Sequence, residues 1–178
     1  RSAAEAWDDA ACGWHRNTAL IREWLHGATQ RMLDAAHLSP GAKVLDVAAG
    51  AGDQTHDLVQ RVGERGEVWV TDLSPHILAL AQANLRGAKG ARLHFQVADA
   101  QALGMAGANF DAAICRLGLM FCPSPAAALR EMHRALRPGG RLSVLVFSNA
   151  QANPCVALTM RAARRHAGLP DAEPFAPG

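Results

Sequence analysis

From Gly41 onward, short apolar runs alternate with stretches of helical period, and this alternation limits the fold more than any other feature. The predicted strands are residues 43–47, 67–71, 92–97, 110–115 and 141–147. The predicted helices between them are residues 53–62, 75–85 and 125–136. Strands separated by helices pair in parallel through right-handed crossovers, which place helices on both faces of the sheet. The chain is therefore predicted to be an α/β protein with a doubly wound, mostly parallel sheet.

The regions on either side of this pattern are predicted to be helical. Apolar residues recur every three or four positions between residues 17 and 37, and more weakly between residues 3 and 11. A further helix is expected over residues 153–168. At 178 residues the chain has the length of one domain. We expect a single domain, 1–178, made of an N-terminal helical cap (1–39), a core (40–150) and a C-terminal part (151–178).

The composition excludes several classes of protein. The 18 basic and 16 acidic residues give a net charge of +2, which is too balanced for a typical nucleic-acid-binding domain. An arginine-rich stretch at residues 161–166 is interpreted as a solvated helix face. The four cysteines form no CxxC pair and no Cys/His ligand spacing, so we expect no disulfide framework, no metal site and a cytoplasmic location. We also expect neither a signal peptide nor a membrane span.

The most informative segment runs from Val44 to Thr55, where an apolar strand leads through a loop of small residues into a helix. Gly50 and Gly52 can adopt positive φ, which lets backbone amides at the helix start approach a nucleotide-like ligand. The same pattern also occurs in ordinary tight strand-to-helix turns. The segment alone therefore leaves both interpretations open.

Two acids and an arginine follow the next three strands. Asp72 ends the second strand, where it either accepts hydrogen bonds from ribose hydroxyls or helps to cap the following helix. Asp99 follows the third strand, where a carboxylate suits an adenine amino group. Arg116 interrupts an apolar run after the fourth strand, and is either a cavity residue or a surface residue at a strand end. All three belong to the carboxyl edge, where open α/β sheets bind ligands.

Together these segments resemble the class I S-adenosylmethionine-dependent methyltransferases, in particular the small-molecule group that includes the ubiquinone and menaquinone C-methyltransferases. The segments that carry the resemblance are Asp46 to Gly52, Asp72, Asp99-Ala100, Phe110 to Arg116 and Leu136 to Leu142. The resemblance implies a Rossmann-like fold and a site for S-adenosyl-L-methionine. The implied cofactor site has Asp46, Ala48, Gly50 and Gly52 around the methionine end, Asp72 and Leu73 at the ribose, Asp99 and Ala100 at the adenine, and Arg116 in the adjoining cavity.

Three features bear on this resemblance. Ala48 stands where the fullest family motif has its first glycine, so the loop is expected to lie slightly further from the cofactor. The family sheet has strands in the order 3-2-1-4-5-7-6, and strands six and seven are not found here, so the C-terminal part is expected to be truncated. The dehydrogenase fingerprint would place a third glycine at Thr55, and the absence of that glycine argues against NAD.

The resemblance implies an enzyme that transfers a methyl group to a small-molecule acceptor by in-line displacement. The alternatives are a non-catalytic S-adenosylmethionine-binding regulatory subunit and an RNA or protein methyltransferase. An apolar lining from Trp14, Leu117, Met120 and Phe121 favours an aromatic or lipid-like acceptor. We nominate no catalytic base, although His15 lies where a lid could fold over the cofactor. We expect no nucleic-acid partner and leave a homodimer open.

Overall fold

The computed structural model describes residues 2–149 and 151–170. It divides into two compact units, Arg1–Leu145 and Val146–Gly178, and each is described by itself. The expected boundary between the core and the C-terminal part, after residue 150, lies close to this division. The single domain stays a prediction. Within the described ranges, no helix has the length and hydropathy that crossing a bilayer requires.

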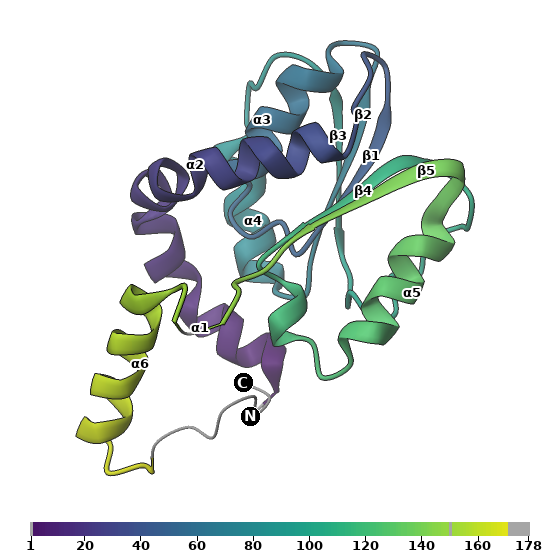
Figure 1. Ribbon diagram of the computed structural model, residues 1–178. Coiled ribbons are helices and arrows are strands. Elements are labelled where there is room, and N and C mark those ends of the chain that lie inside the picture. Colours follow the sequence, from purple (N-terminus) through teal and green to yellow (C-terminus); the bar gives the residue numbers. More distant parts are fainter. Residues whose placement is uncertain (1, 150, 171–178) are drawn as a thin grey trace. The chain divides into compact units, whose positions relative to one another are not determined.

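In the described part of the first unit, five parallel strands form one sheet, and the predicted fold class is confirmed (Figure 1). The strands are β1 (Lys43–Val47), β2 (Glu67–Asp72), β3 (Arg92–Val97), β4 (Phe110–Arg116) and β5 (Leu136–Leu145). Their order in the sheet is β3-β2-β1-β4-β5, which matches the first five positions of the expected family order. Because the strands are parallel, the turns that follow their carboxyl ends lie along one edge.

The helices occupy the predicted regions, and two of them begin with a serine cap. The helices are α1 (Ala3–Arg16), α2 (Thr18–Ala35), α3 (Asp53–Val62), α4 (Pro75–Asn84), α5 (Pro125–Ala135) and, in the second unit, α6 (Pro154–His166). The Ser74 hydroxyl accepts a hydrogen bond from the Ile77 amide at 3.0 Å, and Ser124 accepts one from Ala127 at 3.3 Å. Each serine is followed by a proline at the first helical position.

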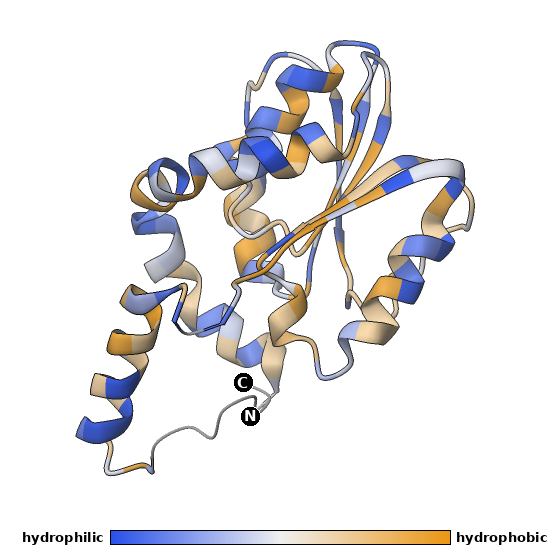
Figure 2. Cartoon of the chain, in the orientation of Figure 1, coloured by the Kyte–Doolittle hydropathy of each residue, from blue (hydrophilic) through white to orange (hydrophobic). Residues whose placement is uncertain are grey.

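Alternate residues of the strands enter two hydrophobic cores, one on each face of the sheet. Val44 and Ile114 belong to the core beneath α2, α3 and α4. Leu45 and Cys115 belong to the core beneath α5. This alternation follows from the period of two along a strand. Figure 2 shows the result: apolar residues run along the strands, while α3 and α5 carry hydrophilic stretches.

Polar contacts fix α2 along α3. Arg22 pairs with Asp57 at 2.6 Å, and Gln30 donates a second hydrogen bond to the same carboxylate at 3.1 Å. Arg61 donates to the Gln30 side-chain oxygen at 2.5 Å and pairs with Asp34 at 2.6 Å. These contacts join both ends of α2 to one helix, so the residues of α2 that face the sheet are held in a defined register.

Strand β5 differs from its prediction: it begins at Leu136 and not at 141, and it ends at Leu145 and not at 147. Leu136 already pairs with Phe110, after which the register shifts and Arg141 pairs with Ala112. Gly139, with φ of 80°, lies within this irregular stretch. The glycine-rich segment that was expected to precede the strand is therefore part of it, because a bulge absorbs the extra residues.

The connection from β3 to β4 crosses the sheet without a helix in the described structure. It contributes Leu103 and Met105 to the core beneath α5. Elsewhere in the sheet a crossover helix covers the apolar face of the strands. Here the two buried side chains provide part of that cover. The connection begins at the carboxyl edge with Asp99, buries Leu103 and Met105, and returns to the surface over residues 106–109 before β4.

Candidate active site

A cavity opens at the carboxyl edge of the sheet. The turns after β1, β2, β3 and β4 all contribute to its lining, and α1 and α2 complete it. Among the residues predicted for the site, those that line the cavity are Ala48, Gly50, Asp72, Leu73, Asp99, Ala100 and Arg116. The fold thus brings together residues from four strand ends that are far apart in the sequence.

The β1 turn is shaped by three residues with positive φ. Ala48, Gly50 and Gly52 have φ of 54°, 59° and 84°. At Gly50 a side-chain carbon would meet no atom within 4 Å, so the backbone faces open space there. The Gly50 amide donates a hydrogen bond to Asp72 Oδ2 at 2.9 Å, which ties the β1 turn to the end of β2. The small side chains and the open backbone leave room for a ligand close to the main chain.

Asp72 is buried and supports two turns at once. Its Oδ2 accepts from Gly50, and its Oδ1 accepts from the Ser74 amide at 3.0 Å. Burial raises the pKa of the Asp72 carboxyl above its usual value, against the effect of the amides that donate to it. Each carboxylate oxygen has a second lone pair, so Asp72 can still accept hydrogen bonds from a diol. The cap of α4 is Ser74, which leaves Asp72 available to the cavity.

Asp99 is held in place by the turn that it begins. Its Oδ1 accepts from the Gln101 amide at 2.8 Å, and the Gln101 side chain donates to it at 3.2 Å. The Gln101 side-chain oxygen in turn accepts from the Ser124 amide at 2.9 Å, at the start of α5. Asp99 and Gln101 both line the cavity. Gln101 was not predicted, and it offers an amide beside the predicted carboxylate.

Two of the predicted residues, Asp46 and Gly52, do not line the cavity. Asp46 is fully buried and accepts hydrogen bonds from Gln54 Nε2 at 3.1 Å and Thr55 Oγ1 at 2.6 Å. Burial raises the pKa of Asp46 to about 7, although both hydrogen bonds oppose the rise. Asp46 therefore supports the start of α3 from behind the turn. Gly52 has φ of 84°, which side chains rarely adopt, and an added carbon would also lie 2.9 Å from a Leu85 methyl, so the position favours glycine.

Ala48 lies against the β4 turn. A side-chain carbon on Gly118 would collide with the Ala48 side chain and would lie 2.9 Å from Cys115 Sγ. Gly118 itself has φ of −84°, so its backbone does not require glycine. The Ala48 methyl group, which departs from the family motif, is therefore accommodated because Gly118, in the turn after β4, has no side chain. The sequence alone gave no sign of this pairing.

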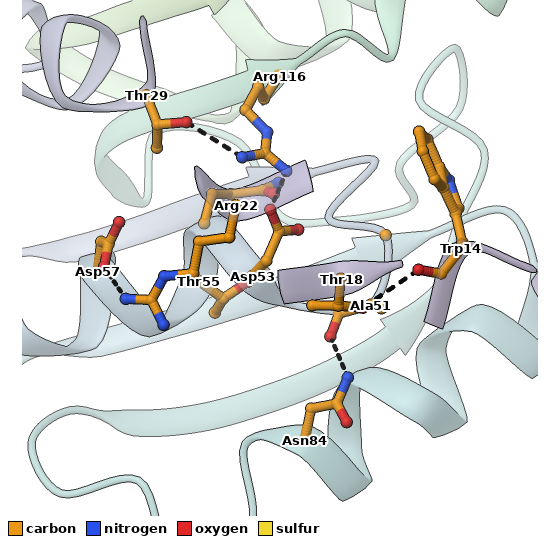
Figure 3. Close-up of polar contacts among 12 residues, drawn as sticks. Trp14, Thr18, Arg22, Thr29, Ala51, Asp53, Thr55, Asp57, Asn84 and Arg116 are labelled. Carbon is orange, nitrogen blue, oxygen red and sulfur yellow. Dashed lines mark hydrogen bonds and ion pairs between the residues drawn. The ribbon is translucent and has the colours of Figure 1, made fainter. Parts of the chain in front are cut away.

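Arg116 lies in the cavity, and not on the surface at a strand end. Its guanidinium forms an ion pair with Asp53, the first residue of α3, and donates a hydrogen bond to Thr29 of α2 at 3.1 Å (Figure 3). The side chains of Arg116 and Asp53 are only 7% and 8% exposed. Asp53 and Thr29 were not predicted. An acid directly after a glycine-containing turn is the available signal for Asp53, and nothing in the sequence indicates Thr29.

Helix α1 contributes aromatic residues to the cavity. Trp7 and Trp14 line it, with ring centroids 6.2 Å apart in a stacked arrangement. Trp7 also meets Phe121 edge to face at 4.9 Å, and Phe121 lines the cavity with Leu117. Of the four residues expected to give an apolar lining, Trp14, Leu117 and Phe121 do so. Met120 is not among the lining residues.

His15 lies outside the cavity lining and faces α4. Its Nδ1 is 3.4 Å from the amide nitrogen of Asn84, which also donates to the Ala51 carbonyl at 2.9 Å. A second contact holds α1 on α4, because Asp8 accepts hydrogen bonds from the Ser74 hydroxyl and from the His76 amide. His15 therefore helps to hold α1 against α4. In the described ranges, no group of three or more His, Cys, Asp and Glu residues could hold a metal ion.

The residues present fit S-adenosylmethionine. An adenosine with its amino group at Asp99 and its ribose at Asp72 would run along the edge from β3 to β2. The open backbone at Gly50 would then face the amino-acid end. Thr55 stands where a dehydrogenase would have glycine. Its hydroxyl donates a hydrogen bond to buried Asp46 and so stabilises the start of α3.

Sequence comparison supports the same interpretation. Residues 20–162 match the ubiE/COQ5 methyltransferase family. The chain is 39% identical over 132 residues to the ubiquinone/menaquinone biosynthesis C-methyltransferase UbiE of Neisseria meningitidis serogroup C. That alignment covers 74% of this chain and 52% of the relative, so the chain spans about half the length of the curated relatives it matches.

Solved structures share the fold. A SAM-dependent methyltransferase from Aquifex aeolicus aligns with a TM-score of 0.59 at 23% identity, over 65% of this chain and 62% of that one. The [4+2]-cyclase SpnF aligns with a TM-score of 0.59 at 27% identity, over 66% of this chain and 43% of that one. The Rossmann-like fold is therefore confirmed, and the cyclase illustrates that a fold does not fix a reaction. The resemblance seen in the sequence is confirmed by the family match: the chain belongs to the ubiE/COQ5 methyltransferase family.

Proposed function

We propose that this chain is the cofactor-binding part of an S-adenosylmethionine-dependent methyltransferase that acts on a small molecule. One observation carries the proposal: a single cavity brings the glycine-containing β1 turn together with Asp72 and Asp99. Membership of the ubiE/COQ5 methyltransferase family supports it. No observation favours the regulatory subunit or the RNA or protein methyltransferase.

The cofactor would be held mainly by the carboxyl ends of β1, β2 and β3. Asp72 and Leu73 would bind the ribose, and Asp99 and Ala100 the adenine. Ala48 and Gly50 would lie along the methionine end, with Arg116 next to it. Asp46 and Gly52 would act from behind the turn, through the start of α3 and the packing of α4.

The acceptor would enter on the side of α1 and α2. The side chains there are predominantly apolar, with Trp14, Ile21, Leu25 and Leu117 in the lining. Such a lining suits an aromatic or lipid-like molecule. The curated relatives are named for the C-methylation of ubiquinone and menaquinone precursors, and we propose a quinone-related ring as the acceptor class here.

The protein would act chiefly by positioning. When bound, S-adenosylmethionine supplies a methyl group on a sulfonium, which an acceptor carbon in line with the C–S bond can take. The strand-end residues fix one partner and the apolar lining fixes the other, and such alignment is worth up to about 7 to 11 kcal/mol in well-oriented systems. The stacked Trp7 and Trp14 would exclude water from the apolar side.

We further propose a cytoplasmic location and no nucleic-acid partner. The four cysteines are free thiols, which fits a reducing compartment. The net charge of +2 lacks the basic excess of nucleic-acid-binding domains. A homodimer stays open.

Thermal unfolding tests the cofactor assignment directly. With S-adenosylhomocysteine at about 100 times its Kd, binding should stabilise the chain by about 2.7 kcal/mol, and raise its Tm by roughly 5 to 10 °C. NAD at the same concentration should give no shift. A cooperative transition that is unmoved by S-adenosylhomocysteine and S-adenosylmethionine would contradict the proposal.

Matched variants locate the site. Asp72→Asn should weaken S-adenosylhomocysteine binding by about tenfold or more, because a charged acceptor is lost in a buried place. Asp34→Asn changes a carboxylate that is 68% exposed, and should leave binding unchanged. Transfer of a labelled methyl group to quinone-precursor phenols then separates an enzyme from a regulatory subunit, since the latter would bind the cofactor without turnover.

A further inference from the structure

Arg116 is the one basic residue among the described residues that line the cavity, and it is paired with Asp53. Arg116 ends β4 and Asp53 begins α3, and both line the cavity (Figure 3). Thr29, 2% exposed, accepts from Nη1 of the same guanidinium. A guanidinium has five N–H groups, and the two interactions seen in the described structure use two of them. Because Arg116 lines the cavity, its remaining N–H groups are the candidates for contact with a ligand.

Burying such a pair is costly for a fold. Well-packed apolar residues of similar size are often as stabilising as a buried ion pair, or more so. The neighbouring residues Leu25 and Leu117 are apolar, and an apolar side chain at position 116 would continue their surface. The charge therefore calls for an explanation in binding or reaction.

The order of the strands places Arg116 at one end of the cavity. Along the edge, Asp99 follows β3, Asp72 ends β2, the Gly50 turn follows β1 and Arg116 ends β4. A cofactor with its adenine at Asp99 would therefore have its methionine part, which carries the sulfonium, on the side of Arg116. Helix α2 contacts Arg116 through Thr29, and the α2 residues Ile21 and Leu25, which line the same cavity, are apolar. Arg116 thus lies where cofactor and acceptor would meet.

We propose that Arg116 binds the ring oxygen of a hydroxylated aromatic acceptor as its phenolate, while Asp53 and Thr29 hold the guanidinium in position. This assignment rests on the proposed function and names its substrate class. The phenolic proton leaves to solvent, and the N–H groups of Arg116 then donate to the oxygen. The negative charge enriches the ring carbons ortho and para to the oxygen, which prepares one of them as the nucleophile. An apolar surrounding strengthens the attraction between the two charges.

The test uses 4-nitrophenol, whose phenolate is yellow, bound to the chain in the presence of saturating S-adenosylhomocysteine. Wild type should lower the apparent pKa of the bound probe by about one unit or more relative to the free probe, because an opposite charge favours the ionised form. Arg116→Gln should abolish the shift, and Arg116→Lys should retain part of it. Arg22→Gln is the matched control, since Arg22 pairs with Asp57 away from the cavity, and it should keep the full shift.

Asp53→Asn distinguishes a binding role from a structural one. It removes the negative charge beside Arg116 and keeps a hydrogen-bond acceptor, so the pKa of the bound probe should fall further than in wild type. If the pair were purely structural, Asp53→Asn and Arg116→Gln would both reduce the pKa shift of the bound probe. A larger shift in Asp53→Asn and a smaller one in Arg116→Gln support the assignment, whereas equal losses of the shift overturn it.

Three further outcomes would overturn the assignment, and they can be told apart. If Arg116→Gln weakens S-adenosylhomocysteine binding but not that of 5′-methylthioadenosine, which lacks the amino-acid part, Arg116 holds the cofactor carboxylate. If wild type does not bind S-adenosylhomocysteine in the thermal assay, the proposed function fails and the acceptor role fails with it. If the cofactor binds but the probe shows no pKa shift, only the acceptor role fails.

Discussion

The turns after β1 and β4 lie on neighbouring strands, yet they present different chemical groups to the same cavity. The β1 turn offers small side chains and open backbone around Gly50. The β4 turn offers the long side chains of Arg116 and Leu117. An open backbone allows close approach of many different ligands, whereas a charged or bulky side chain discriminates among them. If the proposed function holds, we expect the β1 turn to contact the cofactor and the β4 turn to select the acceptor.

The two turns also share a form of strain. Ala48 and Leu117 both have positive φ without being glycine, at 54° and 59°. Such a conformation costs a residue with a side chain roughly 1 to 2 kcal/mol. The turns then meet where Gly118 makes room for Ala48. Each turn can therefore be tested alone and in combination with the other.

The largest effect is expected when the link between the two turns is broken. Asp53→Ala would leave the Arg116 guanidinium buried without an anion, at a cost of about 3 to 5 kcal/mol. Urea denaturation at neutral pH measures the change. Asp34→Ala, which removes a largely exposed partner of Arg61, should cost about 1 kcal/mol or less. Equal losses of unfolding free energy in the two variants would show that the cavity ion pair contributes no more to stability than a surface ion pair.

A slightly smaller effect on stability should come from a change of pH. It concerns Asp46, which supports the β1 turn from behind. The pKa of folded Asp46 is about 7 against 3.8 ordinarily, so between these values the folded chain keeps a proton that the unfolded chain has lost. The contribution of Asp46 to stability should therefore be fully present below about pH 4, be lost between about pH 4 and pH 7, and stay constant above that range. The fall should be on the order of 2 to 4 kcal/mol. Asp46→Asn should flatten the profile, and parallel profiles would exclude Asp46 as its cause.

The smallest effect is expected at the contact between the turns. Gly118→Ala should cost about 1 to 3 kcal/mol, because its new methyl group would collide with Ala48. Adding Ala48→Gly should recover much of the loss, which a double-mutant cycle measures. Gly27→Ala on α2 meets nothing within 4 Å and should be neutral or stabilising. Additive effects of the two substitutions would mean that the turns do not contact each other in this way.

The sequence predicted the strands and the edge of the sheet at which the cavity lies. Period-two and helical patterns depend only on residues close together in the sequence, so β1 to β4 and the helices between them could be predicted. Strand β5 was harder, because its first residues owe their place to pairing with Phe110 across a bulge. The acids Asp72 and Asp99 were found because each directly follows an apolar run at a strand end.

The members of the site were only partly predictable. A motif indicates that Asp46 and Gly52 belong to the turn, but not that they lie behind it. The contacts of Arg116 join residues 63 and 87 positions apart in the chain, which no local pattern can indicate. The aromatic lining from α1 likewise depends on how Asp8 attaches that helix to α4.

The sequence by itself determined the fold class, the binding edge and the family, because these follow from local periodicity and from short motifs. Only the tertiary structure decided which side chains face the cavity, which support it from behind, and that Arg116 is held between Asp53 and Thr29. The physical reason is that burial and ion pairing depend on distances between segments. Those distances are set when α2, α3 and β4 pack together.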